Sequence, residues 1–158
     1  GEPGHVCRSG PRCAADYQSR ISGPLLDRMD IQIELGAVKP SDLTLPPPKE
    51  SSAEAAARVA AARAIQVQRF IRLGRPLLRT NAEADGTLLE EIARPDEAGL
   101  KLLRDAADAM QLSARGYHRV LRVARTLADL DGRPDLARIH IAEALSYRQR
   151  PASLKAAA

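Results

Sequence analysis

The sequence is short of aromatic side chains, with no tryptophan, one phenylalanine and three tyrosines among 158 residues. A hydrophobic core must therefore come from Leu, Ile, Val and Ala, which favours close-packed helices over an all-β sandwich. Two cysteines are too few for a disulfide scaffold, which indicates a reducing, cytoplasmic location. No stretch approaches the roughly 18–20 consecutive apolar residues of a membrane span, and no secretory signal is recognisable.

The sequence also lacks the local motifs of self-contained enzymes. It contains no GxxxxGK[ST] phosphate loop, no GxGxxG, no HExxH and no GxSxG. We therefore expect this chain alone to lack a nucleoside triphosphate pocket and to be inactive as an enzyme. The chain starts at Gly1 and reads as a piece of something longer. Its net charge of +4, with arginine far in excess of lysine, permits a polyanionic partner without identifying one.

The first fifty residues resemble loops and a single strand. Residues 1–15 are rich in Gly, Pro and Arg, and a short helical turn over 16–20 is expected to stop near Ser22 and Pro24. Residues 31–35 alternate apolar and polar side chains, which predicts a β-strand. No later segment is suited to pair with it. Its sheet is therefore expected upstream, and these residues should pack poorly on their own.

The rest of the chain is predicted to be helical. Ser51 and Glu54 have the spacing of a capping box and predict a long helix that ends at Gly74. Shorter helices are expected over 87–92, capped by Thr87, and over 96–110, 113–130 and 138–148. On the long helix, one face is expected to pack and the other to carry arginines; the packed face holds Ala56, Val59, Ala60, Val67, Phe70 and Ile71, and the arginines are Arg58, Arg69 and Arg72.

The segment 113–130 separates its apolar and basic side chains. The apolar face holds Tyr117, Val120, Leu121, Ala124, Leu127 and Ala128, and the opposite stripe holds Arg115, His118, Arg119, Arg122 and Arg125. Like charges at this spacing repel, so the stripe needs an anion, an acidic neighbouring helix or open water. Arg115 differs from the others because it lies in the first turn, where free amides and the helix dipole favour an anion.

Three further groups of residues could carry chemistry. Arg28 directly precedes the predicted strand, and its simplest role is a local ion pair with Asp27 or Asp30. Exposed pairs contribute little, so that role does not explain the arginine. Cys7 and Cys13 are spaced as C-x5-C, but two thiolates cannot complete a tetrahedral zinc site. His140 is interpreted as a packing or surface residue rather than a metal ligand.

Three motifs carry a family resemblance. YQSRISGPLLDRMDIQIEL, LSARGYHRVLRVARTLADLDG and HIAEALSYR together resemble the competence-type magnesium-chelatase-like AAA+ ATPases (ComM-like proteins), over nearly the whole chain. The resemblance implies a mostly α-helical C-terminal part of an AAA+ module. Its parts would be the tail of the α/β core with the last strand at 1–35, a Pro-rich linker at 36–50, a long helix at 51–73, a helical lid at 74–150 and a flexible tail at 151–158.

The resemblance also implies roles for individual residues. Arg28 would be the arginine finger that reaches the γ-phosphate of ATP in a neighbouring subunit. Arg115 would be the sensor-2 arginine that contacts the nucleotide of its own subunit, and Arg119 and Arg122 would share its face. The complete protein would use ATP and Mg²⁺. A further cysteine pair upstream would join Cys7 and Cys13 in binding Zn²⁺.

By the same resemblance, the complete protein would be a homo-oligomeric, hexameric ATPase motor that acts on DNA. Its work would be that of a helicase or branch-migration factor in DNA uptake and recombination. Two alternatives stay open. One is a standalone arginine-rich helical module that binds nucleic acid through the 113–130 stripe. The other is a magnesium-chelatase subunit, although nothing in the sequence resembles a porphyrin pocket.

Overall fold

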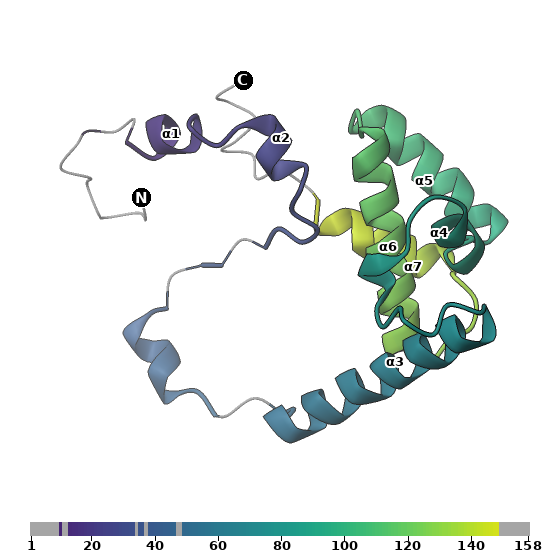
Figure 1. Cartoon of the computed structure of the whole chain (residues 1–158). Coiled ribbons are helices and arrows are strands. Elements are labelled where there is room, and N and C mark those ends of the chain that lie inside the picture. Colours follow the sequence, from purple (N-terminus) through teal and green to yellow (C-terminus); the bar gives the residue numbers. More distant parts are fainter. Residues whose placement is uncertain (1–9, 11–12, 34, 37, 47–48, 149–158) are drawn as a thin grey trace. The chain divides into compact units, whose positions relative to one another are not determined.

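The computed structural model describes residues 10, 13–33, 35–36, 38–46 and 49–148. The chain divides into two compact units, and we describe each by itself: residues 1–47 together with 147–158, and residues 48–146. The described residues are mostly helical, as the sequence predicted (Figure 1). None of the described helices is both long enough and apolar enough to span a bilayer.

The described part of the first unit contains short helices: α1 (Cys13–Gln18), α2 (Gly23–Leu26) and the 3-10 helix η1 (Pro40–Thr44). α1 begins three residues before the predicted turn. α1 ends at Gln18, before Ser22 and Pro24, as predicted; a separate helix, α2, then follows, with Ser22 as its N-cap residue and Pro24 in its first turn. Proline is well tolerated there, since its missing N–H has no intrahelical partner at that position.

The strand predicted over residues 31–35 is also wrong for this chain. Its described residues form no strand, and Ile31, Ile33 and Leu35 have exposed side chains. A strand needs a second strand to pair with along its length, and the described residues form no such strand. The backbone N–H of Gln32 instead donates to the carbonyl oxygen of Tyr147 at 2.8 Å, within the same unit. Alternation alone therefore did not make a strand.

The second unit is a helical bundle. It contains α3 (Ser52–Arg72), η2 (Asn81–Glu83), α4 (Gly86–Ile92), α5 (Glu97–Ala109), α6 (Ala114–Leu130) and α7 (Arg138–Ser146). α6 packs against α3, α4 and α7, and α7 also packs against α5 (Figure 1). The core is made of aliphatic residues and one aromatic ring; its larger members are Phe70, Leu89, Leu103, Val120, Leu121, Leu136 and Ile141. The aliphatic core agrees with the composition.

Most helix ends follow the predicted signals. The side chain of Ser113 accepts from the N–H of Gly116 at 3.0 Å, and Gly74 adopts a left-handed φ of 69° just after α3. The prediction that Thr87 caps α4 is wrong, because the N-cap residue is Asp85. Gly86 starts that helix with a φ of 48°, a conformation that glycine adopts readily, and the helix therefore begins before Thr87.

The packed face of α3 differs from the prediction. Its buried residues are Ala62, Gln66 and Phe70, spaced four residues apart, while Val59 and Ile71 are about half exposed. Arg69, predicted on the far side, forms an ion pair with the buried Asp129 of α6. The short apolar side chains of α3 gave no unique face from periodicity, and contact with α6 selected it.

The capping box of α3 predicts a pH dependence. The N–H of Ser51 donates to the carboxylate of Glu54 at 2.7 Å, and this bond, followed by that from the Ser51 hydroxyl, lowers the pKa of Glu54. A lowered pKa in the folded state means that the cap stabilises the helix above the ordinary glutamate pKa of about 4.3. That stabilisation is lost as the pH falls below this value.

We therefore expect amide protection in the first turn of α3 to drop between pH 6 and pH 3, measured by hydrogen exchange and corrected for intrinsic rates. The variant Glu54→Gln should show the lower protection at both pH values. Equal protection of the wild-type first turn at the two pH values would contradict this role of the carboxylate.

Candidate functional site

Arg28 lies in the turn that closes α2. Its backbone N–H donates to the carbonyl oxygen of Leu25 at 3.0 Å, so the residue continues the helical turn. The side chain of Arg28 is exposed and forms no hydrogen bond or ion pair with any described residue. The simple role of a local ion pair with Asp27 or Asp30 is therefore wrong. The guanidinium is available to a partner outside this chain.

The residues on either side of Arg28 are held by Arg148, which the sequence did not single out. One terminal nitrogen of Arg148 donates to Oδ1 of Asp27 at 2.9 Å, and the other donates to the carbonyl oxygen of Met29 at 3.0 Å. The side chain of Arg148 is only 6% exposed. The turn that presents Arg28 is thus fixed on both sides within the first unit.

Arg115 is the second residue of α6 and lies in the second unit. The side chain is exposed and forms no hydrogen bond or ion pair with a described residue. The side chain of the neighbouring N-cap, Ser113, accepts the N–H of Gly116. The first amides of α6 and the free guanidinium together form an electropositive helix end suited to an anion. The anion contact of Arg115 stays a prediction.

The remaining arginines of the α6 stripe are not equivalent to Arg115. Arg119 and Arg122 are half-buried, and Nε of Arg122 donates to the carbonyl oxygen of Ala84 at 2.9 Å. That bond ties α6 to the loop before α4. Arg119 and Arg122 share the face of Arg115 as predicted, but part of the Arg122 guanidinium already has a structural partner.

Arg125 is the clearest correction to the predicted basic stripe, because its side chain is buried. Its Nε donates to Oδ1 of Asp129 at 3.1 Å, and its terminal nitrogens donate to the carbonyl oxygens of Arg133 and Pro134. Burial lowers the pKa of the Arg125 guanidinium, and the charge of Asp129 opposes that shift. Arg125 is therefore a structural residue and unavailable to a nucleic acid.

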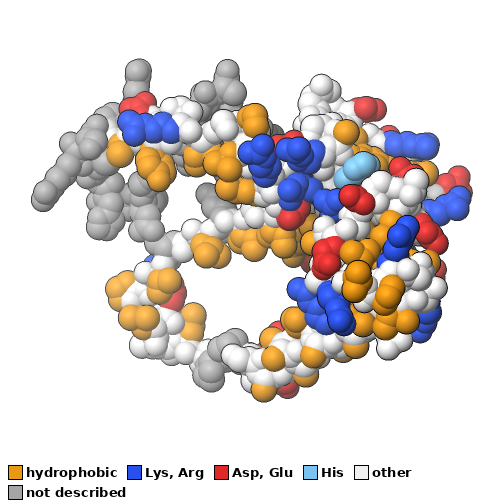
Figure 2. Space-filling view, viewed as in Figure 1, with side chains coloured by type: hydrophobic (Ala, Val, Ile, Leu, Met, Phe, Trp, Pro, Cys, Tyr) orange, Lys and Arg blue, Asp and Glu red, His pale blue; other side chains and the backbone are white. Residues whose placement is uncertain are grey.

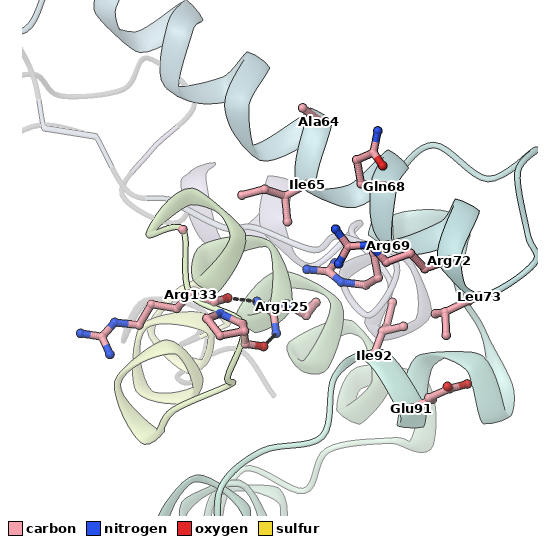
Figure 3. Close-up of a pocket in the computed structure, with 12 residues that line it drawn as sticks. Ala64, Ile65, Gln68, Arg69, Arg72, Leu73, Glu91, Ile92, Arg125 and Arg133 are labelled. Carbon is pink, nitrogen blue, oxygen red and sulfur yellow. Dashed lines mark hydrogen bonds between the residues drawn. The ribbon is translucent and has the colours of Figure 1, made fainter.

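Asp129 is the centre of this buried network. Its fully buried carboxylate accepts from Arg69 and Arg125 and from the side-chain amide of Asn81, at 2.8 Å for the last. The network joins α3, η2 and α6 and lies beside a cavity of about 680 Å³. Figure 3 shows Arg69 and Arg72 close together at this cavity, while the side chain of Arg133 points away from them.

The visible surface of the second unit is mixed in charge. In Figure 2, Lys and Arg side chains gather in several groups on the visible face, and Asp and Glu side chains lie among and between them. The burial of Arg125 removes one arginine from the four-arginine stripe on which the standalone nucleic-acid module depended.

The predicted metal site stays a prediction. Cys7 lies outside the described residues, and Cys13 is half-buried at the start of α1. Within the described ranges, no group of three or more His, Cys, Asp or Glu side chains is arranged to hold a metal ion. His140 has the predicted packing role: it is buried, its Nδ1 accepts the N–H of Ala137 at 3.0 Å, and its Nε2 contacts Asp131 at 3.1 Å.

Comparison with known families gives two adjoining matches. Residues 49–148 match the family described as "Magnesium chelatase, subunit ChlI C-terminal", and residues 1–43 match "Magnesium chelatase, subunit ChlI". The first match covers the whole described second unit. The boundary between the two matches falls close to the start of α3.

Curated relatives are similar over most of this chain. An uncharacterized protein of Mycobacterium tuberculosis is 42% identical over 138 residues, which are 84% of this chain and 26% of the relative. "Competence protein ComM" of Haemophilus influenzae is 34% identical over 142 residues, 89% of this chain and 26% of the relative. "Uncharacterized protein YifB" of Escherichia coli is 35% identical over 150 residues, 92% and 28% respectively. The chain thus spans about a quarter of the length of the curated relatives it matches.

Proposed function

The chain belongs to the magnesium chelatase subunit ChlI family, and from this premise we propose that it supplies two nucleotide-contacting arginines to an ATP-hydrolysing AAA+ motor. In this proposal Arg28 is the arginine finger, and Arg115 contacts the nucleotide of its own subunit. The observation that carries the proposal is that both guanidinium groups are exposed and have no partner in the described part of the chain, whereas Arg122 and Arg125 are engaged.

The residues of this chain suit the charge of a triphosphate but cannot enclose it. Two arginines can each donate paired N–H groups to phosphate oxygens. The sequence contains no phosphate-binding loop, so the cradle of ATP and its Mg²⁺ would come from another part of a longer protein. Arg28 would act across a subunit interface, which requires a homo-oligomer; a hexamer is the assembly we propose.

The role of Arg28 is to place a positive charge next to the negative charge that develops in the transition state. During phosphoryl transfer the charge is spread over the γ-phosphate oxygens, and a guanidinium placed there stabilises the transition state more than bound ATP. Arg115, at the start of α6, has a different role: it would bind the nucleotide in its ground state and so couple the helical bundle to nucleotide occupancy. The two arginines should therefore affect different kinetic constants.

Arg115→Ala tests the second role. In the complete motor we expect the substitution to weaken nucleotide affinity by about tenfold to a hundredfold, the value of one charge-assisted contact. The matched control is Arg138→Ala, because Arg138 is also an exposed arginine in the first turn of a helix, α7. Fluorescent-nucleotide titration measures both. Equal affinities for the two variants would reject the proposed contact.

We propose DNA as the substrate of this motor, in DNA uptake and recombination, with helicase or branch-migration activity. The support is the name of one relative, "Competence protein", and the basic net charge of the chain. We expect DNA to raise ATP turnover of the complete motor above its basal rate, with the stimulation falling as salt rises. Turnover that DNA does not change at low salt would remove the DNA part of the proposal and leave the ATPase part standing.

A further inference from the structure

Arg148 is a buried arginine whose two terminal nitrogens contact both neighbours of Arg28. One nitrogen donates to Oδ1 of Asp27 at 2.9 Å, and the other donates to the carbonyl oxygen of Met29 at 3.0 Å. Asp27 and Arg148 are 121 residues apart in sequence, yet both belong to the first unit. The side chain of Arg28, between the two contacted residues, stays exposed.

These contacts fix the backbone on both sides of Arg28. The N–H groups of Asp27 and Met29 already donate to the carbonyl oxygens of Gly23 and Leu26 in the turn after α2, at 2.9 and 3.1 Å. Arg148 adds a side-chain anchor before Arg28 and a backbone anchor after it. A second tie follows immediately, because the N–H of Gln32 donates to the carbonyl oxygen of the residue preceding Arg148 at 2.8 Å.

We propose that Arg148 is a positioning residue for Arg28, holding the turn so that the Arg28 side chain points to its phosphate partner. This inference rests on the proposed function of Arg28 as an arginine finger. An arginine finger works only if its guanidinium meets the γ-phosphate within a narrow range of positions, and a misplacement of about 1 Å can cost a hundredfold in rate. A flexible turn would not provide that precision.

The choice of arginine at position 148 supports a geometric role. The guanidinium is a rigid planar fork, so it can bind a carboxylate and a carbonyl oxygen at a fixed separation. Lysine has a single ammonium group on a flexible stem and cannot reproduce both contacts in one fixed geometry. Nε of Arg148 is buried with no acceptor in the described part of the chain, which is a cost to stability. The fork is therefore better explained by the turn it holds than by stability alone.

The test uses Arg148→Ala and Arg148→Lys in the complete motor, with Arg104→Ala as control, since Arg104 is an exposed arginine of α5 without a polar contact in the described chain. We expect Arg148→Ala to lower kcat at least about tenfold, and less than Arg28→Ala does, with nucleotide affinity unchanged. Arg148→Lys should restore only part of kcat. Unchanged kcat in both Arg148 variants overturns the inference.

Mixed assemblies separate a misplaced arginine finger from general damage. Arg148→Ala subunits keep their own nucleotide contacts, and Arg115→Ala subunits keep their finger. At ATP concentrations that do not saturate Arg115→Ala, we therefore expect mixed assemblies to turn over ATP faster than assemblies of either variant alone, because some ATP sites then combine an intact Arg115 with an intact finger. The absence of this gain means that Arg148→Ala damages its own subunit, and the positioning role is then rejected.

Two further measurements keep the inference distinct from the proposed function and from misfolding. In this chain, hydrogen exchange at the Gln32 amide should accelerate in Arg148→Ala and in Asp27→Asn, while the amides of α6 stay protected. Unchanged exchange at Gln32 in both variants overturns the anchoring contact itself. If Arg28→Ala keeps full turnover, the proposed function fails. If Arg28→Ala loses turnover and both Arg148 variants keep it, only the positioning role fails.

Discussion

Replacing Arg28 with alanine in the complete motor is expected to lower ATP turnover by about a thousandfold or more and to leave nucleotide affinity near the wild-type value. Arginine fingers contribute on the order of 10³–10⁵ in rate, because they neutralise charge that grows in the transition state. The side chain of Arg28 has no polar contact with a described residue, so its removal breaks no bond among the described residues. The loss should therefore be kinetic, with folding unaffected.

Arg20→Ala is the matched control for this experiment. Arg20 is also an exposed arginine in a turn of the first unit, and its side chain has no polar contact in the described chain. Steady-state hydrolysis gives kcat, and a separate nucleotide titration gives affinity, so the two effects are not confused. Turnover of Arg28→Ala within twofold of the Arg20→Ala value would show that Arg28 is not the finger.

Arg28 also shows which parts of the candidate site the sequence alone could predict. The segment LLDRMD and the first turn of 113–130 identified Arg28 and Arg115 through a family resemblance, and the structure finds both side chains exposed. The motif HIAEALSYR ends at Arg148, but the resemblance assigned this residue no role, and its contact with Asp27 joins residues more than a hundred positions apart. A contact of that range leaves no periodic or local signal.

The sequence predicted the helices well, because each signal for the start or end of a helix lies within a few residues. The Ser51–Glu54 capping box, the Ser113 cap and the stop at Gly74 depend on side chains within one turn of the helix end. The strand at 31–35 failed for the opposite reason. A strand is completed only by a partner, and pattern alone could not provide one.

The prediction of an exposed basic stripe on α6 was wrong at Arg125 because of the way α3 packs against α6. In the sequence, Asp129 follows Arg125 by four residues, which is about one helical turn. Arg69 approaches the same carboxylate from α3, sixty residues earlier in the chain. Two arginines sharing one buried acid is a tertiary arrangement. The spacing of Arg125 and Asp129 could have suggested an internal pair, but not its burial.

That buried acid should be the most sensitive single position for the stability of the bundle. We expect Asp129→Ala to lower the free energy of unfolding by about 3–5 kcal/mol, because it leaves the buried guanidinium of Arg125 without its counter-charge. The side-chain amide of Asn81 and the guanidinium of Arg69 lose the same acceptor. The free energy of unfolding of a small domain is about 5–15 kcal/mol in total, so this loss would be a large fraction of it.

Asp129→Asn should lower the free energy of unfolding nearly as much as Asp129→Ala. It keeps the volume of the side chain, but it places an uncharged amide group against the arginine donors. The control is Asp105→Asn, because Asp105 is an exposed aspartate inside α5 with no polar contact in the described chain, and surface changes stay within about 0.5 kcal/mol. Urea unfolding of the whole chain, followed by circular dichroism, measures each variant. Arg69→Met should cost less than Asp129→Asn, because the Arg69 side chain is 17% exposed and its loss leaves Arg125 paired with Asp129. If Asp129→Asn and Asp105→Asn unfold at the same urea concentration, the carboxylate does not hold α3 and α6 together.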